Sequence, residues 1–228
     1  MRKKIVLYGM ILLLGGCDLI EYHPYDVRLH GELGINAKNI ARIEEACEGK
    51  DTLRFVLMGD SQRWYDETED FVKAVNKRDD IDFVILGNGM DVFNDVFGDE
   101  NFSFRAGKTK FVCMNTNALE FDYSHPVPDF TFMYNELQDT VGCPRTVPVM
   151  HVQPFNVEFN NNVARGFHAL LREFPGVEFC LHAHSHSLLH EELFDDGIPY
   201  IGCAAMKDKN YLLFTLTPGG YEYEVVYY

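Results

Sequence analysis

The spacing of hydrophobic residues switches several times between the periods of strands and helices. Residues 53–58 form an apolar run interrupted only by Arg54, residues 66–78 carry their apolar side chains on one side, and residues 81–86 form a second apolar run interrupted only by Asp82. Short apolar runs indicate buried strands, and the one-sided segment indicates an amphipathic helix. A strand, a helix and a strand in this order predict a βαβ unit whose two strands are parallel and buried on both faces.

The same periods continue to the end of the chain. We predict further helices at 36–47, 130–137 and 163–174, and further strands at 102–104, 111–115, 146–151, 177–181, 188–193, 199–203, 211–216 and 221–227. No internal repeat, low-complexity tract or linker in the sequence marks a second domain. The pattern therefore predicts an α/β fold of layered α+β type, with one domain over residues 51–228.

The N-terminus has the layout of a secretory signal. Three basic residues precede the apolar stretch 5–14, which is too short to span a bilayer. Leu14-Gly15-Gly16-Cys17 resembles a bacterial lipobox, in which the signal is removed before a cysteine that then carries a lipid. We expect residues 1–16 to be a signal peptide, Cys17 to be lipidated, and residues 17–50 to form a connector and a short helix. The protein would be anchored in the bacterial cell envelope, periplasmic or surface-exposed; the alternative is a soluble secreted protein with an incidental cysteine.

Composition and charge narrow the classes of partner. The 228 residues are 46% hydrophobic and 14% aromatic, as in folded globular proteins rather than disordered or collagen-like chains. Lys and Arg number 20 against 35 Asp and Glu, which gives a net charge of -15. Phosphate backbones and anionic headgroups repel such a chain, so we expect no nucleic-acid binding, and membrane contact through the lipid anchor alone. The cysteine spacing contains no C-x-x-C pair, and we assign no disulfide.

Side chains capable of chemistry are concentrated where predicted strands end. Asp60 follows the first strand and His151 ends another, while His182, His184 and His186 follow a third at alternate positions. In an extended segment, alternate imidazoles project to one side and can chelate a cation. With a carboxylate, this mixed oxygen and nitrogen set suits Zn, Mn or Fe. The ordinary alternatives are a turn or cap for the Asp, a hydrogen-bonded structural role for the lone His, and a histidine-rich surface loop.

These motifs, in this order, resemble those of the calcineurin-like metallophosphoesterases. Gly59-Asp60-Ser61-Gln62 is similar to the family's Asp-x-His motif with Gln62 in place of the histidine, and Met150-His151 is similar to its lone His. Ala183-His184-Ser185-His186 is similar to its Gly-His-x-His. The resemblance covers nearly the whole chain from about Leu53. It implies a metallophosphoesterase-like β-sandwich flanked by helices, two divalent metal ions, and hydrolysis of a phosphorylated small molecule or a phosphodiester.

The resemblance also implies a division of ligands between the two ions. One ion would be held by Asp60 and His186, with Gln62 as a further candidate. The other would be held by His151 and His184 together with an Asn of the family's third motif. The metals would neutralise phosphate charge and activate a bridging water for attack on phosphorus.

The middle of the chain departs from the family. Residues 86–91 read Leu-Gly-Asn-Gly-Met-Asp where the second motif is expected, and no Gly-Asn-His-Asp follows before residue 102. A central βα unit is therefore expected to be missing, and with it the bridging carboxylate, one metal-binding Asn and the catalytic His. Asn88 and Asp91 are candidate replacements as metal ligands, but nothing replaces the histidine, so no catalytic residue is assigned.

Three functions follow from this reading of the motifs. The first is a metal-dependent phosphoesterase, impaired or inactive because the middle motifs are absent. The second is a non-catalytic envelope lipoprotein that binds a metal or a phosphate-containing ligand. The third is another kind of zinc hydrolase using the histidines of residues 182–186, which lack the H-E-x-x-H spacing of a helix-borne site.

Overall fold

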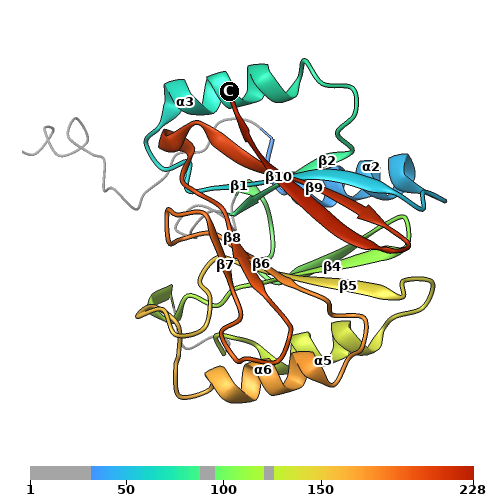
Figure 1. Ribbon diagram of the computed structural model, residues 1–228, viewed down its shortest axis with the longest axis vertical. Coiled ribbons are helices and arrows are strands. Elements are labelled where there is room, and N and C mark those ends of the chain that lie inside the picture. The colour runs from blue at the N-terminus through green and yellow to red at the C-terminus, as the bar shows by residue number, and fades with distance from the viewer. Residues whose placement is uncertain (1–31, 88–95, 121–125) are drawn as a thin grey trace, which may run out of the picture. The chain divides into compact units, whose positions relative to one another are not determined.

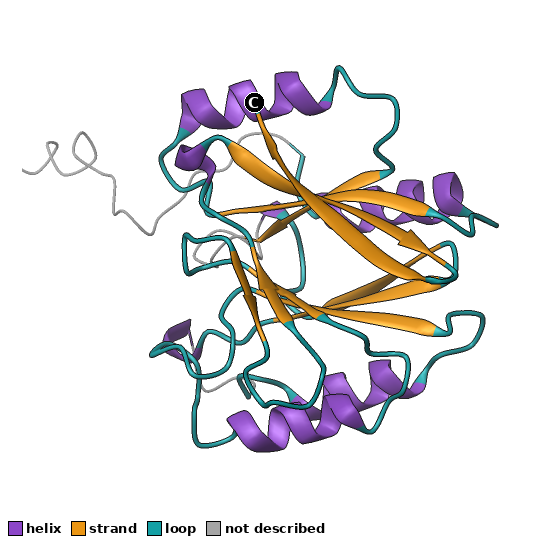
Figure 2. Cartoon of the chain, viewed as in Figure 1, coloured by secondary structure: helices purple, strands orange, loops and turns teal. Residues whose placement is uncertain are grey.

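The computed structural model describes residues 32–87, 96–120 and 126–228. The compact unit Leu33–Tyr228 consists of two β-sheets that face each other, with helices on the outer face of each sheet and a further helix packed against the core between them (Figures 1 and 2). This confirms the predicted layered α/β architecture. None of the helices in these ranges combines the length and the apolar character needed to cross a bilayer.

The first sheet has four strands in the order β10-β9-β1-β2. β1 (Leu53–Gly59) pairs in parallel with β2 (Phe83–Gly87), and α3 (Tyr65–Val75) connects them, as the βαβ prediction required. β9 (Asn210–Thr217) is antiparallel to β1 and forms a hairpin with β10 (Gly220–Tyr227). The C-terminal hairpin thus completes a sheet begun near residue 53.

The second sheet has six strands in the order β3-β4-β5-β6-β8-β7. These strands are β3 (Phe102–Ala106), β4 (Thr109–Met114), β5 (Arg145–Met150), β6 (Cys180–His182), β7 (Leu189–Glu191) and β8 (Tyr200–Gly202). β4, β5, β6 and β8 run parallel, so their carboxyl ends lie at the same edge, while β3 and β7 are antiparallel edge strands. β6 is shorter than predicted because residue 177 makes only an isolated bridge to β5.

Three of the described helices cover the outside of the two sheets, and a fourth packs against the core between them. α5 (Phe130–Gln138) and α6 (Ala164–Arg172) pack on the six-stranded sheet, and α3 packs on the four-stranded sheet (Figure 1). α2 (Ile35–Cys47) lies across from β2 and β3. Two short 3-10 helices, η2 (Ala118–Glu120) and η3 (Met206–Asp208), complete the described elements.

Aromatic side chains fill the space between the sheets. Phe55 of β1 stacks on Phe83 and Phe214 of the same sheet at centroid distances of 5.3 and 5.1 Å. Phe111 of the opposite sheet meets Phe55 edge-on at 5.2 Å and stacks on Phe104 at 4.9 Å. Alternate residues of β1 point instead toward α3, which is the two-sided burial that its apolar run predicts.

β2 forms one edge of the four-stranded sheet, with β1 as its strand partner. Val84 and Leu86 on this strand are each 36% exposed. After β2 the chain continues to β3 in the other sheet, through the region where a central βα unit is expected to be missing. Two candidate ligands of that region, Asn88 and Asp91, lie outside the described residues, as does Cys17.

Candidate functional site

Four of the candidate ligands come together at the carboxyl ends of strands from both sheets. Asp60 follows β1, His151 follows β5, and His184 and His186 follow β6. The Asp60 Oδ1 atom is 3.2 Å from Nε2 of His186 and 3.8 Å from Nε2 of His151. Nδ1 of His184 is 3.3 Å from the same His151 nitrogen. The structure therefore makes one cluster of residues that are up to 126 positions apart in the sequence.

The approach of the two sheets at this point depends on a glycine. A Cβ atom on Gly59 would lie 2.6 Å from Cβ of Ala183 and 2.7 Å from the carbonyl oxygen of Gly87. Without a side chain, the end of β1 comes close enough for the Asp60 N–H to donate to Gly87 O at 2.9 Å. The Asp60 Oδ2 atom in turn accepts the backbone N–H of His184 at 2.9 Å. These contacts fix the carboxylate between the strand end and the histidine turn.

Several site residues have backbone conformations that residues other than glycine rarely adopt. Asp60, His184 and His186 have φ angles of 53°, 64° and 49°, in the left-handed region, and Gln62 has a φ of 38°. Such conformations cost of order 1–3 kcal/mol each and are found preferentially at functional sites. Their concentration in this cluster is an independent indication that its geometry is selected for a task other than stability.

The histidine segment is not extended throughout, and His182 does not join the cluster. It is fully buried on β6, on the same side as Cys180, and its Nδ1 lies 3.0 Å from Ala183 O. The left-handed residues His184 and His186 turn the chain after β6. The His186 imidazole therefore faces Asp60 and the His184 imidazole faces His151, instead of continuing the alternation of the strand. Sequence spacing alone could not reveal that turn.

Burial controls the charge of the cluster. Asp60 is 3% exposed, and this burial raises the pKa of its carboxyl group, while His186 and His184 oppose the shift. Burial lowers the pKa of His151 to about 4, with smaller contributions from the other histidines. His151 is therefore neutral at pH 7 and can offer a lone pair to a cation.

Two further polar residues adjoin the histidines. Gln62, the expected substitute for a family histidine, places Nε2 3.3 Å from Nε2 of His186. Glu158 places Oε2 3.4 Å from Nε2 of His184. Glu158 was not predicted, because it lies in an irregular segment after β5 and has no spacing relative to a strand end. Gln153 of the same segment donates to Ser185 Oγ at 2.9 Å and holds the histidine turn in place.

The donor types of the cluster and the spacing of adjacent donors fit a single divalent cation, but the side chains are not yet arranged around one point. Within the described ranges, no group of three or more His, Cys, Asp and Glu side chains is already arranged to hold a metal ion. The contacts form a chain that runs from His186 through Asp60 and His151 to His184. A tetrahedral ion with bonds near 2.1 Å separates its ligand atoms by about 3.4 Å, close to the spacings found here. Adjacent donors in this chain of contacts thus have the spacing of ligands around one ion.

Comparison with known proteins gives a fold likeness and a sequence likeness. No protein-family model matches the sequence. A thymidylate kinase from Jannaschia sp. (strain CCS1) is 27% identical over 175 residues, which cover 73% of this chain and 84% of that protein. Among solved structures, GAP50, the anchor in the inner membrane complex of Plasmodium, is similar with a TM-score of 0.54 and 11% identity, over 78% of this chain and 85% of that one. At this identity the likeness shows the fold alone.

Two phosphoesterase-type structures are more distant. A putative 5'-nucleotidase from Staphylococcus aureus has a TM-score of 0.48 and 8% identity, over 77% of this chain and 54% of that one. The calcineurin-like phosphoesterase YfkN from Bacillus subtilis has a TM-score of 0.43 and 7% identity, over 77% of this chain and 90% of that one.

Proposed function

We propose that this protein hydrolyses phosphate esters, a phosphomonoester or a phosphodiester, at the cluster of Asp60, His151, His184 and His186 with the help of a divalent cation. The observation that carries the proposal is the convergence of these four side chains from both sheets, with donor atoms 3.2 to 3.8 Å apart. The buried carboxylate of Asp60 and the left-handed backbone of Asp60, His184 and His186 support a functional role. Zn, Mn and Fe suit this set of one carboxylate and three imidazoles.

The residues of the cluster have separable tasks in this proposal. Asp60 supplies negative charge and, through its backbone and side-chain contacts, orients His184 and His186. His151 stays neutral and presents its lone pair because burial lowers its pKa to about 4. Glu158 orients His184 from the other side of the ring. A bound divalent cation would supply phosphate charge neutralisation and a water of lowered pKa.

The resemblance to the metallophosphoesterases implies two ions, and we propose the second beside the first. Asn88 and Asp91, its candidate ligands from the sequence, lie outside the described residues. Glu158, next to His184, is an additional carboxylate for such an ion.

The test is elemental analysis combined with an activity assay on the full-length chain. After dialysis against trace Mn, Fe and Zn, we expect at least one metal ion per chain and metal-dependent hydrolysis of an aryl phosphate. His186→Ala should lower both occupancy and rate, the rate by about 100-fold or more. His190→Ala is the matched control. His190 lies on β7 and contacts the hydroxyl group of Tyr223, so its replacement should change neither metal occupancy nor rate. A chain that binds no metal would contradict the proposal.

The same assay tests a second function, binding without hydrolysis. This function is considered because the sequence contains no Gly-Asn-His-Asp or Gly-Asn-His-Glu. Without that histidine the cluster could bind a metal or a phosphate-containing ligand and not turn it over. Metal occupancy and phosphate binding without hydrolysis would favour this binding function.

Thymidylate kinase activity is not favoured by the residues. Nucleoside monophosphate phosphorylation of the P-loop type needs G-x-x-x-x-G-K-[ST] between a strand and a helix. The only Gly-Lys-Thr in the sequence is residues 107–109, preceded by Phe102 where the motif has its first glycine. This segment forms the turn between β3 and β4, so no helix follows it.

We further propose that the protein is a lipid-anchored component of the bacterial cell envelope. The basic start, the apolar stretch 5–14 and Cys17 in a lipobox-like context support this. Expression of the full-length chain should place it in the membrane fraction. Cys17→Ser should move it to the soluble fraction, and an unchanged distribution would contradict the anchor.

A further inference from the structure

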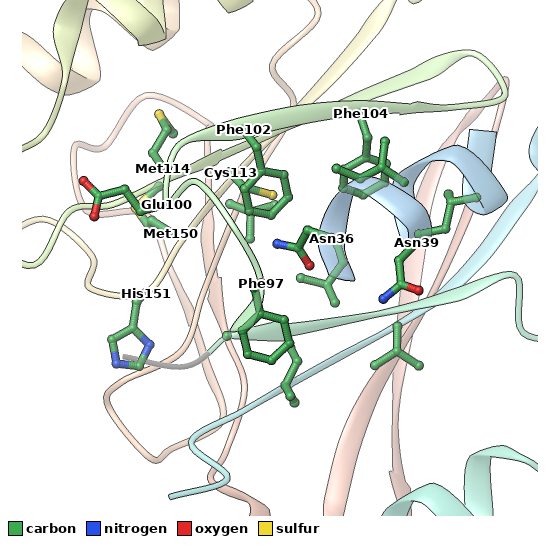
Figure 3. A pocket seen from close by; sticks show the side chains of 17 residues that line it. Asn36, Asn39, Phe97, Glu100, Phe102, Phe104, Cys113, Met114, Met150 and His151 are labelled. Carbon is green, nitrogen blue, oxygen red and sulfur yellow. The ribbon is translucent and has the colours of Figure 1, made fainter. Parts of the chain in front are cut away.

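An apolar cavity of about 230 Å³ opens beside the candidate site. It lies between the edge strand β2, strand β3 and helix α2, and Figure 3 shows Phe97, Phe102 and Asn36 around it. The backbone N–H of Asn36 donates to Phe97 O at 3.1 Å and so joins the start of α2 to the segment before β3. The walls of the cavity are therefore connected elements of the fold.

The cavity is continuous with the cluster through His151, which lines it. The same ring places Nε2 3.3 Å from His184 and 3.8 Å from Asp60. Its Nδ1 is buried, and no residue in the described ranges gives that atom a hydrogen bond. A phosphate ester whose phosphate lies at the cluster would have its alcohol part close to the mouth of the cavity.

The residues that line the cavity indicate which kind of alcohol part of a phosphate ester it could bind. Ile85 of β2 lies on the same inter-sheet side as Phe102 and Phe104, so apolar and aromatic contacts dominate the lining. The described residues that line the cavity include no Lys or Arg, so nothing in this lining favours a second phosphate or another anionic group. A cavity of about 150 Å³ with apolar walls holds a benzene molecule in another protein, so this one has room for a larger, two-ring group.

We propose that this cavity binds the apolar, aromatic alcohol part of a phosphate monoester while the phosphate is held at the Asp60 and histidine cluster. The inference rests on the proposed function and names its substrate class. In the reaction, the oxygen of a water molecule bonds to phosphorus and the ester P–O bond breaks. The alcohol leaves with one proton of that water, and the phosphate product keeps the other.

The test compares two alkyl esters with equally basic leaving groups, 2-(1-naphthyl)ethyl phosphate and ethyl phosphate, on the full-length protein. We expect kcat/KM to favour the naphthyl ester by at least about tenfold, since its rings are buried in the cavity. Asn39→Trp, at an exposed position of α2 that lines the cavity, fills the cavity and should reduce this preference about tenfold. Val141→Trp is the matched control at an exposed position outside the cavity and should leave the preference unchanged.

Other outcomes separate the inference from the proposed function. Hydrolysis of both esters without a preference, or a preference that survives Asn39→Trp, overturns the inference and leaves the phosphoesterase proposal standing. If neither ester is hydrolysed, calorimetry with the matching phosphonates decides. Naphthyl-selective binding lost in Asn39→Trp supports the cavity, and equal or undetectable binding overturns it. Asn36→Trp, which also lines the cavity from α2, replaces Asn39→Trp if circular dichroism shows that the latter does not fold.

Discussion

Asp60 is the residue through which the clustered side chains are connected. Its two oxygens contact His186, His151 and the backbone of His184. Asp60→Asn keeps the shape and the N–H contact but removes the negative charge that attracts a cation. We expect the affinity for Mn²⁺ or Zn²⁺, measured by calorimetric titration, to fall at least about tenfold. Asp70→Asn, which removes an exposed partner of Lys209, is the control; equal affinities in the two variants would remove Asp60 from the site.

His182 makes the free energy of unfolding depend on pH. Burial lowers its pKa from 6.5 to about 4, and its Nε2 has no hydrogen-bond partner in the described part of the chain. Between these values the unfolded chain binds a proton that the folded chain does not, so stability falls as pH falls, by up to about 1.4 kcal/mol per pH unit.

Replacing this side chain tests the origin of that dependence. In metal-free protein, His182→Gln should flatten the fall in urea-derived stability between about pH 6.5 and pH 4 by up to one proton's contribution. Comparison of the two proteins at pH 8, where His182 is neutral in both states, separates the packing change from titration. Identical slopes would show that other groups control the acid sensitivity.

At the scale of elements, the end of β1 is positioned by Gly59. A methyl group there meets Ala183 and the Gly87 carbonyl at 2.6 and 2.7 Å, so the strand end must move. We expect Gly59→Ala to cost about 1–3 kcal/mol and to weaken metal binding as Asp60 is displaced. Gly166→Ala on α6 is the matched control, because nothing lies within 4 Å of its Cβ position. It should stabilise by about 0.5–1 kcal/mol; equal effects in thermal melts would contradict the argument.

The elements that could be predicted from the sequence are those whose residue pattern reports local burial. β1, α3 and β2 were predictable because a short, mostly apolar run and a one-sided helix each report local burial. His182 proved separate from His184 and His186, because the left-handed turn between them depends on contacts with Asp60 and Gln153 from distant segments. Glu158 was missed for the same reason: only the fold brings it to His184.

At the scale of the whole compact unit, the candidate ligands belong to different sheets. Asp60 extends from the four-stranded sheet, whereas His151, His184 and His186 extend from the six-stranded one. The aromatic cluster holds the sheets together in the interior, and at this edge the direct contacts include the approach of Gly59 to Ala183. A cation held by both sets of ligands would join the sheets at the edge where the substrate is proposed to bind.

Because a cation bound by ligands from both sheets would link the sheets, we predict that metal binding stabilises the folded state. A ligand that binds only the folded state at 100 times its Kd adds about 2.7 kcal/mol to the free energy of unfolding. For a chain of this size that corresponds to a rise in Tm of about 5–10 °C, measured by calorimetry with Mn²⁺ or Zn²⁺ against EDTA. His186→Ala should lose most of the rise, since the ion would lose a ligand from the six-stranded sheet, while His190→Ala should keep it. An equal rise in both variants would mean that the metal acts elsewhere, and the cluster would then have to be assigned a role without a cation.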